Sequence, residues 1–282
     1  MMIRQIAIGL AALVVGAGAV QAQTGPLMAR GKYLVDTVMT CHNCHTPRGP
    51  NGLMMDKALS GGLHFDEKPF DVTAANVTSD RETGIGAWSI ADIKKTLITG
   101  VRPNGIPLAN VMPTGFYKVL TARDLDAIAT YLHSVPPVKN KVPAPIYKIA
   151  LPQTFVPNAQ EPMTEADLKD KVKRGFYLAT IAHCMECHSP LGPKGRDFTR
   201  MGGGGFELKG PWGVSVSRNI TSSKTKGLGG WTDAEIKRAI TQGISRDGSK
   251  LKPPMGFEFY AKMRPEDLDD IVAYLRTVPA ID

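Results

Sequence analysis

Cysteine is scarce in this chain of 282 residues, and it occurs in two short stretches only. All four cysteines lie in TCHNCHTPRG at 40–49 and HCMECHSPLG at 183–192. An exported protein usually pairs its cysteines as disulfides. Here none remains to bridge distant parts of the chain, so the sequence excludes a disulfide-stapled scaffold.

Long apolar runs are also missing after residue 22, where no stretch approaches the roughly 20 apolar residues that a membrane-spanning helix needs. Residues 1–22 differ, because Arg4 precedes an apolar run that ends at the small-residue site Val20-Gln21-Ala22. This layout predicts a secretory signal peptide cleaved near Ala22. We therefore expect a periplasmic protein, although a short uncleaved membrane anchor is the alternative.

The formal net charge is +8, but the basic residues form no dense run, so nucleic-acid binding is not predicted. Residues 137–160 contain Lys139, Lys141 and Lys148 and no acidic residue. A mildly basic surface is compatible with docking to an acidic protein patch or with peripheral association with anionic lipid. A solvated surface without any partner explains the charge equally well.

The chain is an internal repeat. At an offset of 143 residues, segment 41–136 matches segment 184–279 with 32 identities in 96 positions and no gap. A repeat of this length predicts two copies of one small domain. The proline-rich segment between the copies has no helical periodicity and predicts an extended linker. The predicted organisation is a signal peptide (1–22), a first domain (27–136), a linker (137–164) and a second domain (165–280).

Both copies carry the same helix signals, and neither contains a convincing strand pattern. The signals are capping-box pairs (Ser89 with Asp92, Thr232 with Glu235), glycine stops (Gly100, Gly243) and starts of a second helix (Thr121, Pro265). A further helix is expected before each cysteine motif, around 27–38 and 165–181. The sequence therefore predicts an all-α fold with a thin core that a bulky apolar cofactor would complete.

The motif Cys-x-x-Cys-His occurs at equivalent positions of the two copies, at Cys41-Cys44-His45 and at Cys184-Cys187-His188. A zinc site does not explain the histidine after each pair, and a thioredoxin-like pair should follow a strand. Two local disulfides would connect nothing. Cys-x-x-Cys-His is the signature of covalent haem attachment, so we predict two c-type haem groups, each with the histidine as an iron ligand.

Methionine supplies the candidates for the sixth iron position. Met112 and Met255 each lie 67 residues after the motif histidine, and no other methionine of the repeat pairs with a methionine. We predict that both are axial ligands, as in electron-transfer haems; two core methionines are the alternative. His64 and His133 are rival ligands, but Glu207 and Arg276 stand at their matching positions.

Three further pairs of residues recur near the motifs and carry weaker hypotheses. They are asparagines or arginines that could bond a haem propionate and tryptophans that could pack on the ring: Asn76 and Asn219, Arg102 and Arg246, Trp88 and Trp231. Ordinary structural packing is the favoured explanation of each of them.

Each half resembles a class I cytochrome c domain through its Gly-x-Tyr helix, its Cys-x-x-Cys-His motif, its methionine loop and its final Tyr-Leu helix. The segments NVTSDRETGIGAWS, NITSSKTKGLGGWT and LDAIATYLHSVPPV are similar to the multihaem cytochrome subunits of periplasmic alcohol, gluconate and aldehyde dehydrogenases. The resemblance implies an all-α tandem of two such domains.

It also implies a function in electron transfer rather than catalysis, with single electrons carried between a periplasmic dehydrogenase, or another redox protein, and the respiratory chain. The rival hypothesis is a dihaem enzyme such as a peroxidase or a thiosulfate-oxidising cytochrome. Such an enzyme needs one haem with an exchangeable ligand, whereas Met112 and Met255 match each other across the repeat.

Overall fold

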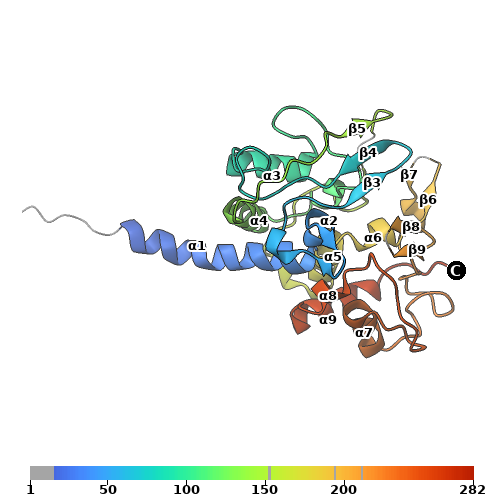
Figure 1. Cartoon of the computed structure of the whole chain (residues 1–282). Helices are drawn as coiled ribbons and strands as arrows, with labels where there is room; N and C mark the ends of the chain where they lie inside the picture. The colour runs from blue at the N-terminus through green and yellow to red at the C-terminus, as the bar shows by residue number, and fades with distance from the viewer. Residues whose placement is uncertain (1–15, 152–153, 194, 211) are drawn as a thin grey trace, which may run out of the picture.

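The computed structural model describes residues 16–151, 154–193, 195–210 and 212–282, with side chains from residue 25 onward (Figure 1). The first 15 residues of the predicted signal peptide lie outside this part. Helix α1 (Gly16–Tyr33) includes the predicted cleavage site near Ala22 and runs out from the body. Among the described residues, no helix combines the length and the apolar character that crossing a membrane requires.

The two halves contain matching helices. In the first half these are α1, the π-helical turn η1 (Leu34–Val38), α2 (His42–His45), α3 (Ile90–Thr99), η3 (Thr114–Phe116) and α4 (Ala122–Ser134). In the second half they are η4 (Asp167–Lys169), α5 (Lys171–Ile181), α6 (Cys184–Cys187), α7 (Asp233–Gln242), α8 (Phe257–Tyr260) and α9 (Pro265–Leu275). Two single 3-10 turns complete the set, η2 (Met55–Lys57) and η5 (Phe198–Arg200).

Local side-chain chemistry sets the ends of α3 and α7, as the sequence predicts. Ser89 and Thr232 cap the two helices in complete capping boxes. Gly100 and Gly243 end them with φ of 70° and 65°, a conformation that favours glycine. These four predictions are confirmed.

The prediction of an all-α fold is wrong. Helix accounts for 37% of the structure and strand for 11%, in several small sheets. The strands are β1 (Arg48–Gly49), β2 (Gly52–Leu53), β3 (His64–Asp66), β4 (Phe70–Thr73), β5 (Ile146–Tyr147), β6 (Leu191–Gly192), β7 (Gly195–Arg196), β8 (Glu207–Gly210) and β9 (Gly213–Val216).

Within the described residues these strands form four antiparallel sheets in the orders β1-β2, β3-β4-β5, β6-β7 and β8-β9. Each strand has only two to four residues, which is too short for the alternation of apolar and polar residues that reveals a strand in a sequence. β4 does show this alternation, although over four residues only: Phe70 and Val72 are buried, while Asp71 and Thr73 are not.

Each half is built on one crossing of two long helices, α1 on α4 and α5 on α9. A glycine lies at both crossings. A Cβ atom on Gly31 would collide with the carbonyl oxygen of Ala127, and a Cβ on Gly175 with that of Asp270. The repeated Arg-Gly-x-Tyr-Leu segment therefore contains glycine because the helix backbones approach closely there.

The two halves share one hydrophobic core, and a pair of equivalent hydrogen bonds joins them. The Tyr33 hydroxyl donates to Oδ2 of Asp267 (2.6 Å), and the Tyr177 hydroxyl donates to Oδ2 of Asp124 (2.7 Å). Tyr33 corresponds to Tyr177, and Asp124 to Asp267, in the repeat. The halves therefore meet through the same contact made in both directions.

The segment predicted to be a linker also packs on the first half. Ile146 and Tyr147 form β5, which pairs with the edge of β4. Tyr147 and Leu151 pack against a small second core of Phe70, Val72 and Ala109. Lys148 forms an ion pair with Asp66 (2.6 Å). This segment therefore covers one edge and one face of the first half.

Candidate functional site

The two Cys-x-x-Cys-His motifs each occupy a single helical turn. The backbone N–H of His45 donates to the carbonyl of Cys41 (2.9 Å), and that of His188 donates to the carbonyl of Cys184 (3.0 Å). This i to i−4 bond places both cysteines and the histidine of a motif around one turn. All four cysteines lie in the described residues and are free thiols.

A strained residue precedes each turn, and sequence reasoning missed it. Thr40 has φ of 50° and His183 has φ of 45°, and the two positions are equivalent in the repeat. Residues other than glycine rarely adopt this left-handed region. Strain of this kind persists where surrounding structure fixes it, and it concentrates at functional sites. Threonine and histidine share no side-chain chemistry, so the sequence gives one hint of this strain only: the two residues are equivalent in the repeat.

The motif histidines have one ring nitrogen engaged and the other free to bind a metal. Nδ1 of His45 lies 2.7 Å from the carbonyl oxygen of Ala75, and Nδ1 of His188 lies 2.6 Å from that of Arg218. A carbonyl only accepts, so Nδ1 carries the proton and Nε2 keeps its lone pair. Burial lowers the pKa of both histidines, which favours the neutral ring that a metal ligand needs.

The motif thiols are held in their neutral form. Burial raises the pKa of Cys41, Cys44 and Cys184 to about 12 each, and burial also raises the pKa of Cys187. The cause is the loss of water around the thiolate. Burial therefore favours the neutral thiol form of these four groups.

The two predicted methionine ligands lie in equivalent loops. The N–H of Thr114 donates to the carbonyl of Met112 (2.8 Å), and the N–H of Phe257 donates to that of Met255 (3.0 Å). A buried Phe-Tyr pair follows each loop, Phe116-Tyr117 and Phe259-Tyr260. Both methionines pack against the shared core, which holds each loop in place.

The second half contains a cavity of about 400 Å³ that brings the predicted site residues together. Cys184, Cys187, His188 and Met255 all line it, together with Trp231 and apolar side chains. Its size lies within the range of 300–1,000 Å³ that is usual for small-molecule and cofactor sites. The thiols, the free imidazole nitrogen and the thioether of one cavity fit a covalently attached haem.

The cavity of the second half reaches the motif of the first. Thr40 and Asn43, from the first motif region, also line it. The Asn43 side-chain amide donates to the carbonyl of Pro254 (2.8 Å), next to Met255. The two motif regions are therefore neighbours across the junction between the halves.

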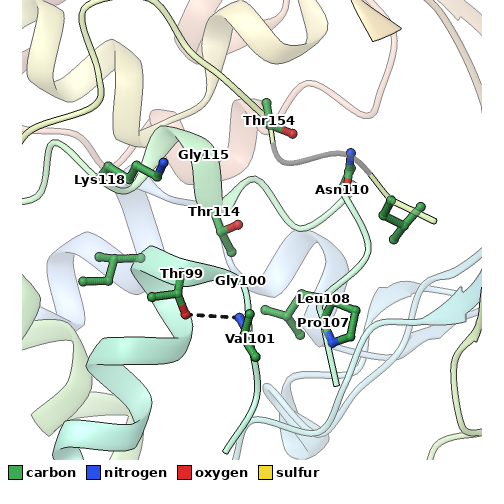
Figure 2. Close-up of a pocket in the computed structure, with 12 residues that line it drawn as sticks. Thr99, Gly100, Val101, Pro107, Leu108, Asn110, Thr114, Gly115, Lys118 and Thr154 are labelled. Carbon is green, nitrogen blue, oxygen red and sulfur yellow. Dashed lines mark hydrogen bonds between the residues drawn. The ribbon is translucent and has the colours of Figure 1, made fainter. Parts of the chain in front are cut away.

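A second, smaller cavity of about 170 Å³ lies beside the Met112 loop, between Gly100, Thr114 and Thr154 (Figure 2). In the second half the ring of Phe257 lies against Gly243, whereas the smaller Thr114 stands at that position in the first half. The cavity therefore opens where the repeat exchanges phenylalanine for threonine.

The paired asparagines, which were weaker candidates for haem contact, have mostly structural roles. Asn76 and Asn219 donate to the backbone carbonyls of Val138 (2.8 Å) and Ile281 (2.6 Å), so each ties the end of its half to the site. Asn219 also lines the large cavity.

The other weaker candidates are two tryptophans, two arginines and two histidines, and their surroundings differ. Both tryptophans pack against the core, and Trp231 also lines the large cavity. Arg102 and Arg246 donate to the backbone carbonyls of Pro107 and Gly230, which are not equivalent positions. His64 and His133 are exposed.

Residues 172–279 match the family described as cytochrome c. This part of the chain is similar to a cytochrome c domain. The family implies covalently bound haem c, in agreement with the cavity that Cys184, Cys187, His188 and Met255 line.

The whole chain is similar to cytochrome subunits of dehydrogenases. It is 27% identical to the cytochrome c subunit of alcohol dehydrogenase (quinone) from Gluconobacter oxydans, over 98% of this chain and 59% of the relative. It is 29% identical to the fructose dehydrogenase cytochrome subunit of Gluconobacter japonicus, over 90% of this chain and 53% of the relative. A diheme cytochrome c-type protein of Cereibacter sphaeroides is 27% identical over 86% of this chain and 83% of the relative.

These similarities confirm the resemblance that the sequence motifs indicate. The chain spans little more than half the length of the two dehydrogenase subunits, so it matches only part of those proteins.

Proposed function

We propose that this chain is a periplasmic dihaem cytochrome c that carries single electrons between a dehydrogenase, or another redox donor, and the respiratory chain. The observation that carries the proposal is the cavity of the second half, which two thiols, one imidazole and one thioether line together. The repeat gives the first half the same set, Cys41, Cys44, His45 and Met112. The signal-peptide pattern of residues 1–22 supports export.

The protein side of this function follows from the residues around the cavity. The cysteines would attach the haem as thioethers, the histidine and the methionine would bind its iron, and the haem would supply the one-electron couple. The carbonyls of Ala75 and Arg218 orient the imidazoles. Two protein ligands per iron leave no position for a substrate, which favours an electron carrier over a dihaem enzyme.

Dehydrogenase partnership is proposed from the relatives, whose names describe cytochrome subunits of alcohol, fructose and gluconate dehydrogenases. The neighbouring motif regions support electron exchange between the two sites of one chain, because Asn43 of one motif bonds to the methionine loop of the other half.

The haem stoichiometry tests the proposal directly. The protein is expressed with a haem-ligation system, and its haem is measured by the pyridine haemochrome assay. We expect two haems per chain, one in Cys41→Ala/Cys44→Ala and one in Cys184→Ala/Cys187→Ala. A colourless wild-type protein would refute the function.

The axial ligands need a separate experiment. Met112→Ala and Met255→Ala should each open one iron to carbon monoxide in the reduced protein, and each should lower one reduction potential. Met55→Ala is the matched control, because Met55 is 56% exposed. Carbon monoxide binding by the reduced wild type would favour the dihaem enzyme instead.

A further inference from the structure

The loop that carries Met255 packs against the cysteine motif of the other half. The Asn43 side-chain amide donates to the carbonyl of Pro254 (2.8 Å). This carbonyl belongs to the peptide unit that joins Pro254 to Met255, and a peptide unit is planar. The bond therefore restrains the backbone of Met255, and through it the direction in which the thioether enters the second cavity.

A second hydrogen bond settles which end of the Asn43 amide faces the loop. Arg48 donates to Oδ1 of Asn43 (2.7 Å), so the amide oxygen is engaged on the side of the first half. An amide oxygen only accepts and an amide nitrogen only donates. The two partners therefore permit one orientation, with the nitrogen directed at the carbonyl of Pro254.

Two further contacts join the same surfaces. The ring of His42 lies nearly parallel to the ring of Phe259 in α8, with an angle of 8° and 6.2 Å between the ring centroids. Thr40 lies against Gly256, because a Cβ atom added to Gly256 would come within 3.2 Å of Cγ2 of Thr40. The first motif region therefore contacts the chain on both sides of Met255.

The repeat does not supply the reverse hydrogen bond at this position. Asn43 corresponds to Glu186 in the second motif, and Pro254 corresponds to Val111, the residue before the methionine of the first half. A carboxylate accepts hydrogen bonds and cannot donate one to a carbonyl. The carboxylate of Glu186 instead lies 3.2 Å from Nδ1 of His183, next to its own motif.

We propose that Asn43 is a positioning residue for Met255, so that the cysteine motif of the first half holds the methionine loop of the second half. The inference rests on the proposed function, because it takes Met255 as an iron ligand. Without the Asn43 bond the Pro254 carbonyl loses this partner. The fraction of chains in which Met255 has left the sixth position should then rise about tenfold.

The probe is imidazole, which binds ferric haem iron when it replaces the methionine. Its apparent affinity rises in proportion to the fraction of chains in which the methionine has left. Met112→Ala and Met255→Ala give two backgrounds in which one iron lacks its methionine and binds imidazole first. The weaker binding step then reports the methionine that remains, and visible absorption of the haem-loaded ferric protein follows both steps.

Asn43→Leu should strengthen the weaker step about tenfold in the Met112→Ala background. In the Met255→Ala background it should change that step less than about twofold, because the step then reports Met112. Asn43→Asp also removes the donor at almost unchanged size, and it decides the question if Asn43→Leu does not load haem. Equal strengthening in both backgrounds would show a general loosening, and no strengthening in the Met112→Ala background would show that the bond does not hold the loop; either result overturns the proposal.

Arg48→Leu is the matched control. Asn43→Leu removes two bonds of the asparagine, whereas Arg48→Leu removes only the bond from the exposed Arg48 and keeps the donor to Pro254. We expect Arg48→Leu to change the weaker step in the Met112→Ala background less than about twofold. Strengthening as large as that of Asn43→Leu would mean that the bond to Pro254 is not the cause, and the assignment would be wrong.

Haem content and the single variant Met255→Ala separate this inference from the proposed function. A colourless protein would refute the function, and a Met255→Ala protein that binds imidazole no more tightly than the wild type would refute the ligand assignment. If Met255→Ala strengthens imidazole binding and the Asn43 variants do not, only the positioning role of Asn43 is refuted.

Discussion

The bonds that join the two halves give a stability prediction whose size follows from burial. The ring of Tyr177 is fully buried (0% exposed), and its hydroxyl donates to Oδ2 of Asp124, which is also buried. A buried hydrogen bond to a charged group contributes about 1.5–3 kcal/mol. Tyr177→Phe should therefore lower the free energy of unfolding by about 2 kcal/mol.

Tyr33→Phe is the matched comparison, because it removes the equivalent bond in the other direction. Tyr33 is only half-buried, so water can replace its hydroxyl at Asp267. Each carboxylate keeps an arginine partner, Arg264 at Asp267 (2.9 Å) and Arg30 at Asp124 (2.7 Å), so the difference between the variants comes from burial. We expect Tyr33→Phe to cost about 1 kcal/mol.

The measurement is guanidinium unfolding of both haem-loaded variants, followed by circular dichroism. In an Asp124→Asn background the cost of Tyr177→Phe should shrink toward about 1 kcal/mol, since the acceptor is no longer charged. A Tyr177→Phe cost below about 0.5 kcal/mol, or one no greater than that of Tyr33→Phe, would contradict the reasoning.

Three further predictions concern helices and pH. Gly31→Ala and Gly175→Ala should each destabilise the protein in thermal unfolding by about 1–3 kcal/mol, because the added Cβ meets backbone; stabilisation, as at an ordinary helical glycine, would refute the close crossing. Thr232→Ala removes the cap of α7 and should cost about 1 kcal/mol in urea unfolding, whereas no cost would show that the capping box is not formed in solution. Burial raises the pKa of Tyr33 and Tyr274 to about 12. Their neutral hydroxyls therefore favour the folded state below pH 10, and this contribution to the free energy of unfolding is lost between about pH 10 and 12. An unfolding free energy that does not fall across this range would contradict the prediction.

The helices could be predicted from the sequence because their signals are local. Ser89 and Asp92 are three residues apart, and the capping box that they form needs nothing from the rest of the chain. The sheets could not be predicted in this way. β5 has two residues, and it is a strand only because it pairs with β4, which lies more than 70 residues before it in the sequence. Tertiary contact, not local pattern, makes such a strand.

The site, too, could be predicted from the sequence only in part. The repeat selected Met255, and the structure places it in one cavity with His188. The repeat also aligned Tyr33 with Tyr177 and Asp124 with Asp267, but it could not show that each tyrosine reaches the aspartate of the other half. A one-dimensional repeat gives corresponding residues, and only the packing decides whether they meet within a half or between halves.

The symmetry of the chain is strong at its centre and weak at its surface. At the junction both halves use the same tyrosine and the same aspartate, and at the motifs both use the same orienting carbonyl. These contacts fix geometry, so an exchange of residues there would disturb both sites. The hairpins differ between the halves, and there Asp66 and Asp71 correspond to Lys209 and Val214 in the repeat. On the proposed function, two sites alike in ligands and unlike in surroundings would present different surfaces to a donor and to an acceptor.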